Sequence, residues 1–264
     1  MKPERRGRLR PPESVAELRA KLLAAGLSSL WKDPAWHPVT SIRLIPGGSR
    51  TAARMPTGAS KFGGDPDLPS GSAWPVGRKR KPLSFLAQIR LADTAPFVSA
   101  AVLPRSGWLW FFADTAATRP EIDCAVLFDE GAGQTLRSMP APRDSRLAIP
   151  SVDIFIERQM QFRKMVGVPE IPPPGLTDEE REAYWSLINP EGIVHKLLGE
   201  PNRIQQPVAH DTGIRSRRAM LLQLDSDRRL DMQWGDNGRL FFALPEVSLR
   251  KANFDRCQAL LQSY

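Results

Sequence analysis

The sequence predicts an α+β fold in which antiparallel sheets form two pseudo-repeated halves, packed as one body with a few peripheral helices. The main observation is a repeat: three blocks recur in the same order, the first two 135 positions apart (199 minus 64) and the third 131 apart (238 minus 107). The paired blocks are residues 60–66 and 195–201, 85–89 and 220–224, and 107–112 and 238–243. Because a repeated unit buries its apolar face against its neighbour, two copies indicate one packed body.

Domain organisation follows from the repeat. Residues 1–12 are rich in arginine and proline with little apolar material, which predicts a flexible basic arm. Residues 13–264 are predicted to form a single domain. Its two halves span about residues 40–118 and 191–264, and residues 119–190 form an intervening segment without a counterpart in either copy.

Two helices are predicted from their first residues. Ser14 and Glu17 have the spacing of a capping box, in which each side chain satisfies a free backbone amide of the other residue. Apolar residues at helical spacing follow directly and predict a helix from residue 15. Thr177 and Glu180 repeat the capping box and predict a second helix that continues to about Ile188.

Alternating apolar residues predict strands in both halves. In residues 85–91 the alternation leaves one clearly buried face. Three antiparallel strands are predicted in the second half, at residues 220–224, 230–234 and 240–242. Asn237 and Gly238 tolerate positive φ, as a type I′ hairpin turn requires, and are predicted to join the last two.

Two further segments are assigned to helices. Residues 151–166 are compatible with a strand or a helix, and we favour a helix from about Ile154. Residues 253–262 are predicted to close the chain as a short helix, with Asn253 as its cap.

Composition limits the classes of function. The net charge of +8 favours acidic partners, whether protein, nucleic acid or membrane surface. Two cysteines, Cys124 and Cys257, are too few for a disulfide framework or a structural zinc site. No apolar run approaches the roughly 18 residues that cross a bilayer. We therefore expect a cytoplasmic protein without a membrane partner.

No common catalytic or phosphate-binding motif occurs in the chain, so no catalytic residue and no cofactor is predicted. Four aspartates, Asp225, Asp227, Asp231 and Asp236, form the densest acidic cluster, but the cluster lacks the glycine of a calcium-binding loop. We predict turn and solvent-facing roles for them, and no metal site.

His195 and a pair of glutamines are the polar candidates. His195 begins a repeat block where the first copy has Ser60, and a histidine without an identifiable nucleophile or carboxylate partner is more often structural than catalytic. Gln88 and Gln223 occupy the same repeat position among apolar neighbours. We expect them to be buried in a hydrogen-bonded network, with a ligand site as the alternative.

Basic loops and tryptophans are candidate interaction residues. Residues 78–81 and 215–218 are basic runs that precede the glutamine-bearing strands; solvated loops are the favoured reading and nucleic-acid binding the alternative. Among the tryptophans, Trp36 stands between two prolines and is expected to be the most exposed. Exposed tryptophans are frequent anchors of protein interfaces.

The chain resembles the YwqG-like proteins, a bacterial family of unknown function, from about residue 40 to its end. The resembling motifs are SKFGGDPDLP at 60–69, WP at 74–75, PLSFLAQI at 82–89, GWLWFF at 107–112, LLQLDSD at 221–227, WGDNG at 234–238 and LFF at 240–242. The resemblance implies an α+β fold with antiparallel sheets and an internal pseudo-duplication. It implies no catalytic residues. Members of the family occur near secreted polymorphic toxins, which implies that some act as immunity proteins.

Our leading hypothesis is a non-enzymatic protein-binding module, an immunity protein that occludes a cognate toxin. The alternative is an enzyme or small-ligand binder with its site at the seam between the halves, and a weaker alternative is nucleic-acid binding through the basic loops. The candidate binding residues are Trp36, Trp74, Arg78, Arg80, Gln88, His195, Gln223, Trp234 and Asp236.

Overall fold

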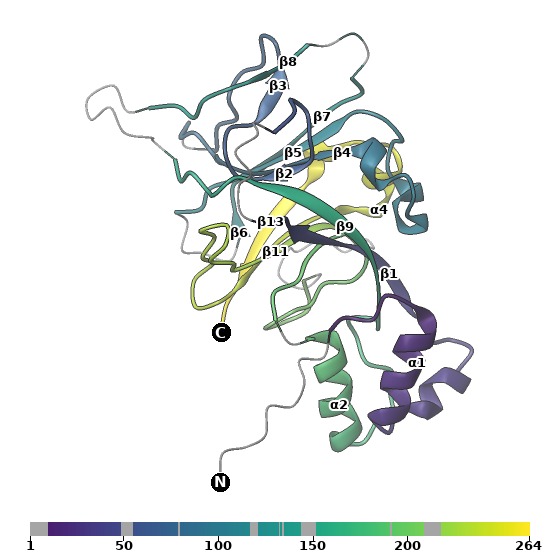
Figure 1. The fold of residues 1–264 in the computed structure, drawn as a ribbon. Helices are drawn as coiled ribbons and strands as arrows, with labels where there is room; N and C mark the ends of the chain where they lie inside the picture. The colour runs from purple at the N-terminus through teal and green to yellow at the C-terminus, as the bar shows by residue number, and fades with distance from the viewer. Residues whose placement is uncertain are drawn as a thin grey trace.

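A single large antiparallel sheet organises the molecule (Figure 1). The computed structural model describes residues 10–48, 55–78, 80–116, 121–131, 133, 135–143, 152–190, 192–208 and 218–264. Within these ranges the sheet has 11 strands in the order β6-β13-β12-β11-β10-β1-β9-β2-β4-β5-β7, and β3 and β8 form a separate pair. Every paired strand runs antiparallel to its neighbour, so the predicted antiparallel α+β class is confirmed.

The elements have the following bounds. The strands are β1 (Val39–Pro46), β2 (Lys61–Phe62), β3 (Asp67–Pro69), β4 (Ser84–Arg90), β5 (Trp108–Ala113), β6 (Glu121–Ile122), β7 (Cys124–Asp129), β8 (Leu136–Ser138), β9 (Arg158–Gly167), β10 (His195–Leu197), β11 (Arg218–Asp225), β12 (Arg239–Pro245) and β13 (Gln258–Gln262). The α-helices are α1 (Val15–Ala24), α2 (Asp178–Ile188) and α4 (Glu246–Arg250), and short 3-10 helices are η1 (Ser28–Lys32), η2 (Leu91–Thr94), η3 (Val98–Val102) and η4 (Phe254–Arg256).

The large sheet curls around its own core. Its two edge strands, β6 and β7, are separated in the sequence by Asp123 alone, so the two edges must come close to each other. Side chains from distant strands meet inside the curl: the rings of Phe111 on β5 and Phe242 on β12 pack edge to face with centroids 5.4 Å apart. Each buried aromatic ring of this kind contributes roughly 1.5 to 3 kcal/mol through burial.

β4 is buried on both faces, which corrects the prediction of one buried face. Leu86 and Ile89 point into the curled core, whereas Phe85 joins a second cluster with Trp110 and Phe112. The β3 and β8 pair lies over this second cluster, to which Leu68 of β3 belongs. A second layer therefore covers the second face of β4, which the alternation in the sequence does not identify as buried.

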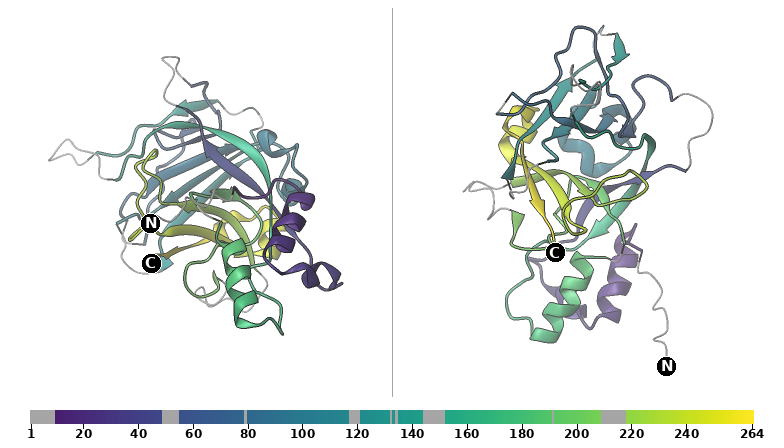
Figure 2. Two further views of the ribbon diagram at one scale, coloured as in Figure 1. Left: turned by 60° about the horizontal axis from the view of Figure 1, so that its bottom comes forward. Right: turned by 90° about the vertical axis from the view of Figure 1, so that its left-hand side faces the viewer.

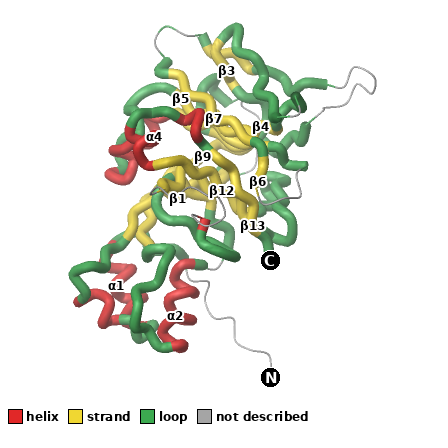
Figure 3. Tube along the Cα trace, turned by 180° about the vertical axis from the view of Figure 1, so that it is seen from behind, coloured by secondary structure: helices red, strands yellow, loops and turns green. Residues whose placement is uncertain are grey.

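The helices α1 and α2 form a separate corner beneath the sheet, and they lie side by side in each view (Figures 1, 2 and 3). Leu18 and Leu22 of α1 pack with Tyr184 and Ile188 of α2 in a cluster of their own. The strands β1 and β9 run from the sheet toward this corner (Figure 1). The helical corner therefore rests on the middle of the sheet order.

Both predicted helix starts are present. At α2 the hydroxyl of Thr177 accepts the amide of Glu180 and the carboxylate of Glu180 accepts the amide of Thr177, so the capping box is complete. At α1 the hydroxyl of Ser14 accepts the amide of Glu17 at 3.1 Å, but Glu17 bonds to the amide of Glu13 instead of closing the box.

Two predicted helices are strands. Residues 154–166 do not begin a helix at Ile154, because Arg158–Gly167 forms β9 and pairs along the whole of β1. The chain end at 253–262 is not a helix either: Gln258–Gln262 forms β13 against β12, and Asn253 makes no cap hydrogen bond. Both errors concern strands whose partners lie far away in the sequence, which local patterns do not reveal.

The predicted strand at 230–234 is also wrong. β11 pairs directly with β12, and between them residues 226–238 form a loop with one isolated bridge, Asp227 to Met232. The turn is not type I′, because Gly235 and Asn237 adopt positive φ and Gly238 does not. A Cβ atom on Gly238 would lie 2.2 Å from the carbonyl oxygen of Gln262, so close backbone approach requires this glycine.

The N-terminal boundary differs from the prediction. Pro11 and Pro12 are buried, and the carbonyl of Pro12 accepts the amide of Val166 at 2.8 Å. The predicted arm of residues 1–12 is therefore too long at this end, and residues 1–9 lie outside the described residues. The intervening segment 119–190 contributes β9 to the middle of the sheet.

Candidate functional site

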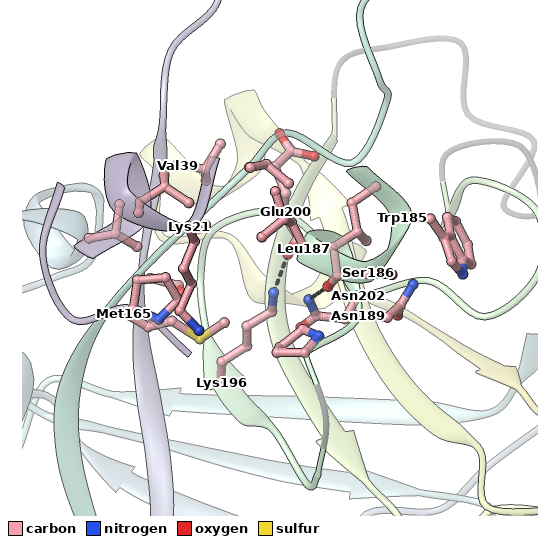
Figure 4. Close-up of a pocket in the computed structure, with 18 residues that line it drawn as sticks. Lys21, Val39, Met165, Trp185, Ser186, Leu187, Asn189, Lys196, Glu200 and Asn202 are labelled. Carbon is pink, nitrogen blue, oxygen red and sulfur yellow. Dashed lines mark hydrogen bonds between the residues drawn. The ribbon is translucent and has the colours of Figure 1, made fainter. Parts of the chain in front are cut away.

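A pocket of about 570 Å³ lies between the helical corner and the sheet (Figure 4). We call it the Lys196 pocket. Its walls come from α1, β1, the end of β9, the C-terminal end of α2, and the segment from β10 to residue 202. Apolar side chains that include Leu18, Val39, Met165 and Leu187 form much of the lining. Its volume falls within the range of small-molecule sites.

Lys196 is the buried charge of this pocket. It is 3% exposed, and its Nζ donates a hydrogen bond to the backbone carbonyl of Glu200. It makes no ion pair with any carboxylate of the described residues. Burial, with a smaller contribution from Arg239, lowers the pKa of Lys196 to about 7, while Asp225, Glu200 and Glu170 act in the opposite direction. Lys196 is thus a desolvated amine with one of its three donors used.

Two asparagines complete the polar wall. The Nδ2 of Asn202 donates to the carbonyl of Ile188 at the end of α2. Asn189 accepts a hydrogen bond from Arg239 at 2.6 Å through its Oδ1, while its Nδ2 is buried without a hydrogen-bond partner. A buried donor without an acceptor costs about 1 to 3 kcal/mol, so an acceptor is wanted at this position.

Lys61 of β2 has the same setting as Lys196 but is fully paired. In the strand register Lys61 lies opposite Gln88, and Lys196 lies opposite Gln223. The Nζ of Lys61 is 3.3 Å from a carboxylate oxygen of Asp67 and 3.2 Å from one of Glu157. The two lysines are equally buried, so the difference between them is in their partners.

Near Lys196, Asn202 occupies the position that Asp67 occupies near Lys61. The Oε1 of Gln88 accepts the amide of Asp67 at 2.8 Å, and the Oε1 of Gln223 accepts the amide of Asn202 at 2.9 Å. Asp67 and Asn202 therefore hold the same place relative to the two glutamines. A neutral amide stands in the Lys196 pocket where a carboxylate stands near Lys61.

Near Lys196, Ser41 occupies the position that Glu157 occupies near Lys61. A Cβ atom on Gly64 would lie 2.7 Å from a carboxylate oxygen of Glu157, and one on Gly199 would lie 2.8 Å from the Cβ of Ser41. Both glycines have positive φ, 70° and 83°. Ser41 is buried and lines the Lys196 pocket, so the position facing Lys196 carries a short hydroxyl in place of a carboxylate.

Gln88 and Gln223 are both completely buried and fully bonded. The Nε2 of Gln88 donates to Ala59 and Asp67, and the Nε2 of Gln223 donates to Val194, Asn202 and Asp225. Each glutamine fixes the loop beside its own lysine. Their hydrogen-bonding groups are occupied by the protein, as in the structural network that the sequence favours.

His195 has the carboxylate partner that the sequence pattern does not reveal. Its Nδ1 accepts the amide of Asp225 at 3.1 Å, so Nε2 carries the proton and donates to Asp227 at 3.1 Å. Burial alone raises the pKa of Asp227, but hydrogen bonds from His195 and Arg229 hold that pKa below its ordinary value. With both ring nitrogens engaged, His195 has no free lone pair for a general base.

The remaining predicted residues are dispersed. Trp36 is 7% exposed and packs in the helical corner, with its indole nitrogen 3.5 Å from the hydroxyl of Tyr184, so the prediction of an exposed Trp36 is wrong. Trp74 donates to the carbonyl of Leu83 at 2.9 Å. Trp234 is buried against Phe155, and its Nε1 has no hydrogen-bond partner.

The exposed candidates are Asp236, Arg78 and Arg80. Arg78 forms an ion pair with Asp123, and Arg80 adopts positive φ in a turn. Residues 215–217 of the second basic run lie outside the described residues, and so does His210. Across the described ranges, no group of three or more His, Cys, Asp or Glu side chains is placed to hold a metal ion.

Sequence reasoning missed Lys196, Asn202 and Ser41 as site residues. The repeat offset of 135 aligns Lys61 with Lys196 (196 minus 61) and Asp67 with Asn202 (202 minus 67). The replacement of Asp67 by Asn202 beside a retained lysine could therefore be recognised from the sequence. Ser41 could not be found in this way, because it precedes the first block and Glu157 lies in the intervening segment.

The fold and the site together define an antiparallel α+β protein with a lysine-containing pocket. The chain matches the family model described as "Domain of unknown function (DUF1963)" over residues 60–262, and it belongs to this family. The match is consistent with the YwqG-like resemblance. No curated protein matches the chain. None of the helices in the described part of the chain combines the length and apolarity of a membrane span.

Proposed function

We propose that this protein binds a small molecule in the Lys196 pocket. The observation that carries the proposal is Lys196 itself, a buried amine on the wall of a ligand-sized cavity that pairs with no carboxylate in the described part of the chain. This proposal follows the small-ligand alternative that the sequence left open, but with the Lys196 pocket as the site in place of one that joins Gln88, His195, Gln223 and Asp236.

A purely structural role for Lys196 does not account for its setting. Taking a charged amine out of water costs several kcal/mol unless partners offset the loss. A methionine of similar length would fill the same place without that cost. Lys61 offsets the cost with Asp67 and Glu157, whereas Lys196 donates only to the carbonyl of Glu200. A ligand group that accepts from Lys196 supplies the missing compensation.

We further infer that the chain consists of two related halves, and that the pocket arose where the second half departs from the first. Matched details support this inference. The amide of Gly63 donates to Leu86 and that of Leu198 to Leu221, both at 2.9 Å. Gly63 and Leu198 also share positive φ, 56° and 61°.

The sheet order supports the same inference. Reading outward from the centre of the sheet, β1, β10, β11 and β12 follow one another on one side, and β9, β2, β4 and β5 follow one another on the other. The paired lysines stand on β10 and β2, and the paired glutamines on β11 and β4. A pseudo-twofold axis between β1 and β9 relates the two sets.

The proposed function is tested with N-phenyl-1-naphthylamine, an uncharged apolar dye whose fluorescence rises on burial. We expect saturable binding at one site per chain. Leu187→Trp fills the pocket wall and should weaken binding at least tenfold, whereas Leu23→Trp, on an exposed position of α1, should leave it unchanged. Equal binding by both variants and the unmodified protein, or no saturable binding at all, would reject the pocket as a ligand site.

The immunity function implied by the family resemblance is kept as a second proposal. Exposed apolar side chains on two helical segments favour a protein partner: Leu23 is 68% exposed and Val98 is 90% exposed. Trp36, which is buried, is no longer among the candidate anchors. A pull-down with the toxin encoded beside the gene, using Leu23→Glu and Val98→Glu as disruptive variants, tests this proposal; absence of capture by the unmodified protein rejects it.

A further inference from the structure

We infer that the ligand of the Lys196 pocket is a monocarboxylate with an apolar body, and that its carboxylate occupies the place that Glu157 holds beside Lys61. The inference rests on the proposed function and names the ligand class for the same site. It follows from three observations: the two replaced carboxylates, the unused donors, and the asymmetric lining of the pocket.

The replaced carboxylates define where the ligand's charge belongs. Near Lys61, two protein carboxylates lie within 3.3 Å of the ammonium group. Near Lys196, the corresponding positions carry Asn202 and Ser41. Because Ser41 is shorter than Glu157, it leaves room beside the lysine. An external carboxylate can fill that room and restore the pairing seen in the first half.

The donors in the pocket suit a carboxylate. Lys196 uses one of its donors on Glu200, which leaves two for an incoming oxygen. The buried Nδ2 of Asn189 has no acceptor among the residues that the structure describes. Hydrogen bonds from an ammonium to a carboxylate are roughly twice as strong as neutral ones, so the lysine provides the main anchor.

The charges around Lys196 favour one negative charge over two. Arg239 is already paired with Asp225 at 3.2 Å. Glu200 is exposed on the pocket lining, and both Glu200 and Glu170 act electrostatically on Lys196. Lys21 also lines the pocket, and its Nζ donates to the carbonyl of Arg10. A doubly charged phosphate would be repelled by the carboxylates of Glu200 and Glu170, whereas a monocarboxylate balances the charge of Lys196.

The rest of the lining suits an apolar body. Leu18, Val39, Met165 and Leu187 contribute apolar side chains to the lining, and Figure 4 labels the last three around Lys196. Burial of each methylene group against such walls contributes about 0.8 kcal/mol. An acid with a hydrocarbon body therefore satisfies both ends of the pocket, which a small hydrophilic acid such as acetate does not.

The test compares three probes of equal length, octanoate, octan-1-ol and octylamine, as competitors of the bound dye. In the unmodified protein at pH 6.5 we expect octanoate to displace the dye at a concentration at least tenfold lower than octan-1-ol, and octylamine to be the weakest. In Lys196→Met the preference for octanoate over octan-1-ol should disappear. Dye binding without this preference, or a preference that survives Lys196→Met, overturns the inference and leaves the proposed function intact.

A second variant gives Lys196 the kind of carboxylate partner that Lys61 has. Ser41→Glu places a carboxylate where Glu157 stands near Lys61, and should abolish octanoate binding by occupying the lysine. Ser41→Gln has the same size without the charge and should keep a preference for octanoate over octan-1-ol. Thermal melting confirms that each variant is folded. Equal octanoate affinities in the two variants would contradict the inference, and they can be compared even where Lys196→Met does not fold.

Discussion

Lys61 and Lys196 show how one scaffold treats the same residue in two ways. Each stands on a short strand, lies opposite a buried glutamine, and precedes a pair of residues with positive φ. The first lysine is neutralised by Asp67 and Glu157, whereas the second has Asn202 and Ser41 at the corresponding positions. The carboxylates around Lys61 therefore offset the cost of its burial, and the same cost at Lys196 is not offset by an ion pair among the described residues.

The largest expected effect comes from removing the paired lysine. Lys61→Met leaves Asp67 buried without its cation, and should lower the free energy of unfolding by about 3 to 5 kcal/mol. Lys196→Met removes an uncompensated amine and should raise that free energy. Urea unfolding of both variants at pH 7 checks the contrast. If both lysines prove equally destabilising to replace, the comparison between the halves is wrong.

The second effect is a pH dependence of stability. The pKa of Lys196 is about 7 in the folded protein and 10.5 as the ordinary value, so the unfolded chain binds more protons between these values. The burial cost is therefore complete below pH 7 and is relieved as pH rises toward 10.5. Relative to that of Lys196→Met, the free energy of unfolding of the unmodified protein should increase by up to about 1.4 kcal/mol per pH unit in this window.

Unfolding curves of the two proteins at pH 7, 8 and 9 measure this difference. Glu170, whose pKa burial raises to about 7, titrates at the lower edge of the window, but it is present in both proteins. Asp225, Arg239 and Glu200 are shared as well, so they largely cancel in the comparison. A difference that does not change with pH would mean that Lys196 stays charged in the folded state.

The third effect concerns affinity. Above pH 7 a carboxylate ligand must bring a proton onto Lys196, so octanoate affinity should fall as pH rises, approaching tenfold per pH unit. The affinity of octan-1-ol should stay constant over the same range. Calorimetric titration at pH 6, 7, 8 and 9 provides the measurement. A flat profile for octanoate would contradict a role for the ammonium form of Lys196.

The smallest effect is expected where the two halves use different residues for the same hydrogen bond. The hydroxyl of Ser60 accepts the amide of Arg90 at 2.9 Å, and the Nδ1 of His195 accepts the amide of Asp225 at 3.1 Å. Ser60→Ala should cost about 1 kcal/mol and leave octanoate affinity unchanged. His195→Gln should likewise alter unfolding and not octanoate affinity; a selective loss of affinity would assign His195 to the site.

Local sequence signals predicted the parts of the fold that local chemistry determines. The capping residues Ser14 and Thr177 place the starts of α1 and α2, and alternation in the blocks around Gln88 and Gln223 places β4 and β11. β9 and β13 were misassigned because their strand character depends on pairing with β1 and β12. Trp36 was misjudged since its flanking prolines do not reveal the helical corner that covers it.

The proposed site was harder to predict because its signal is a difference between two similar segments of the sequence. Buried Gln88 and Gln223 stand out in the sequence, yet they are the elements that both halves share. The proposed site depends instead on Asn202 and Ser41, which stand where Asp67 and Glu157 stand near Lys61. A neutral residue that replaces an acidic one forms no recognisable sequence motif.

The position of β1 has a consequence for synthesis on the ribosome. β1 leaves the exit tunnel early, but both of its neighbours in the sheet come much later: β9 begins at Arg158 and β10 at His195. Strand pairing over such distances is slow to form, and an unpaired strand invites association with other nascent chains. β1 must therefore wait without its partners until β9 and β10 have been translated.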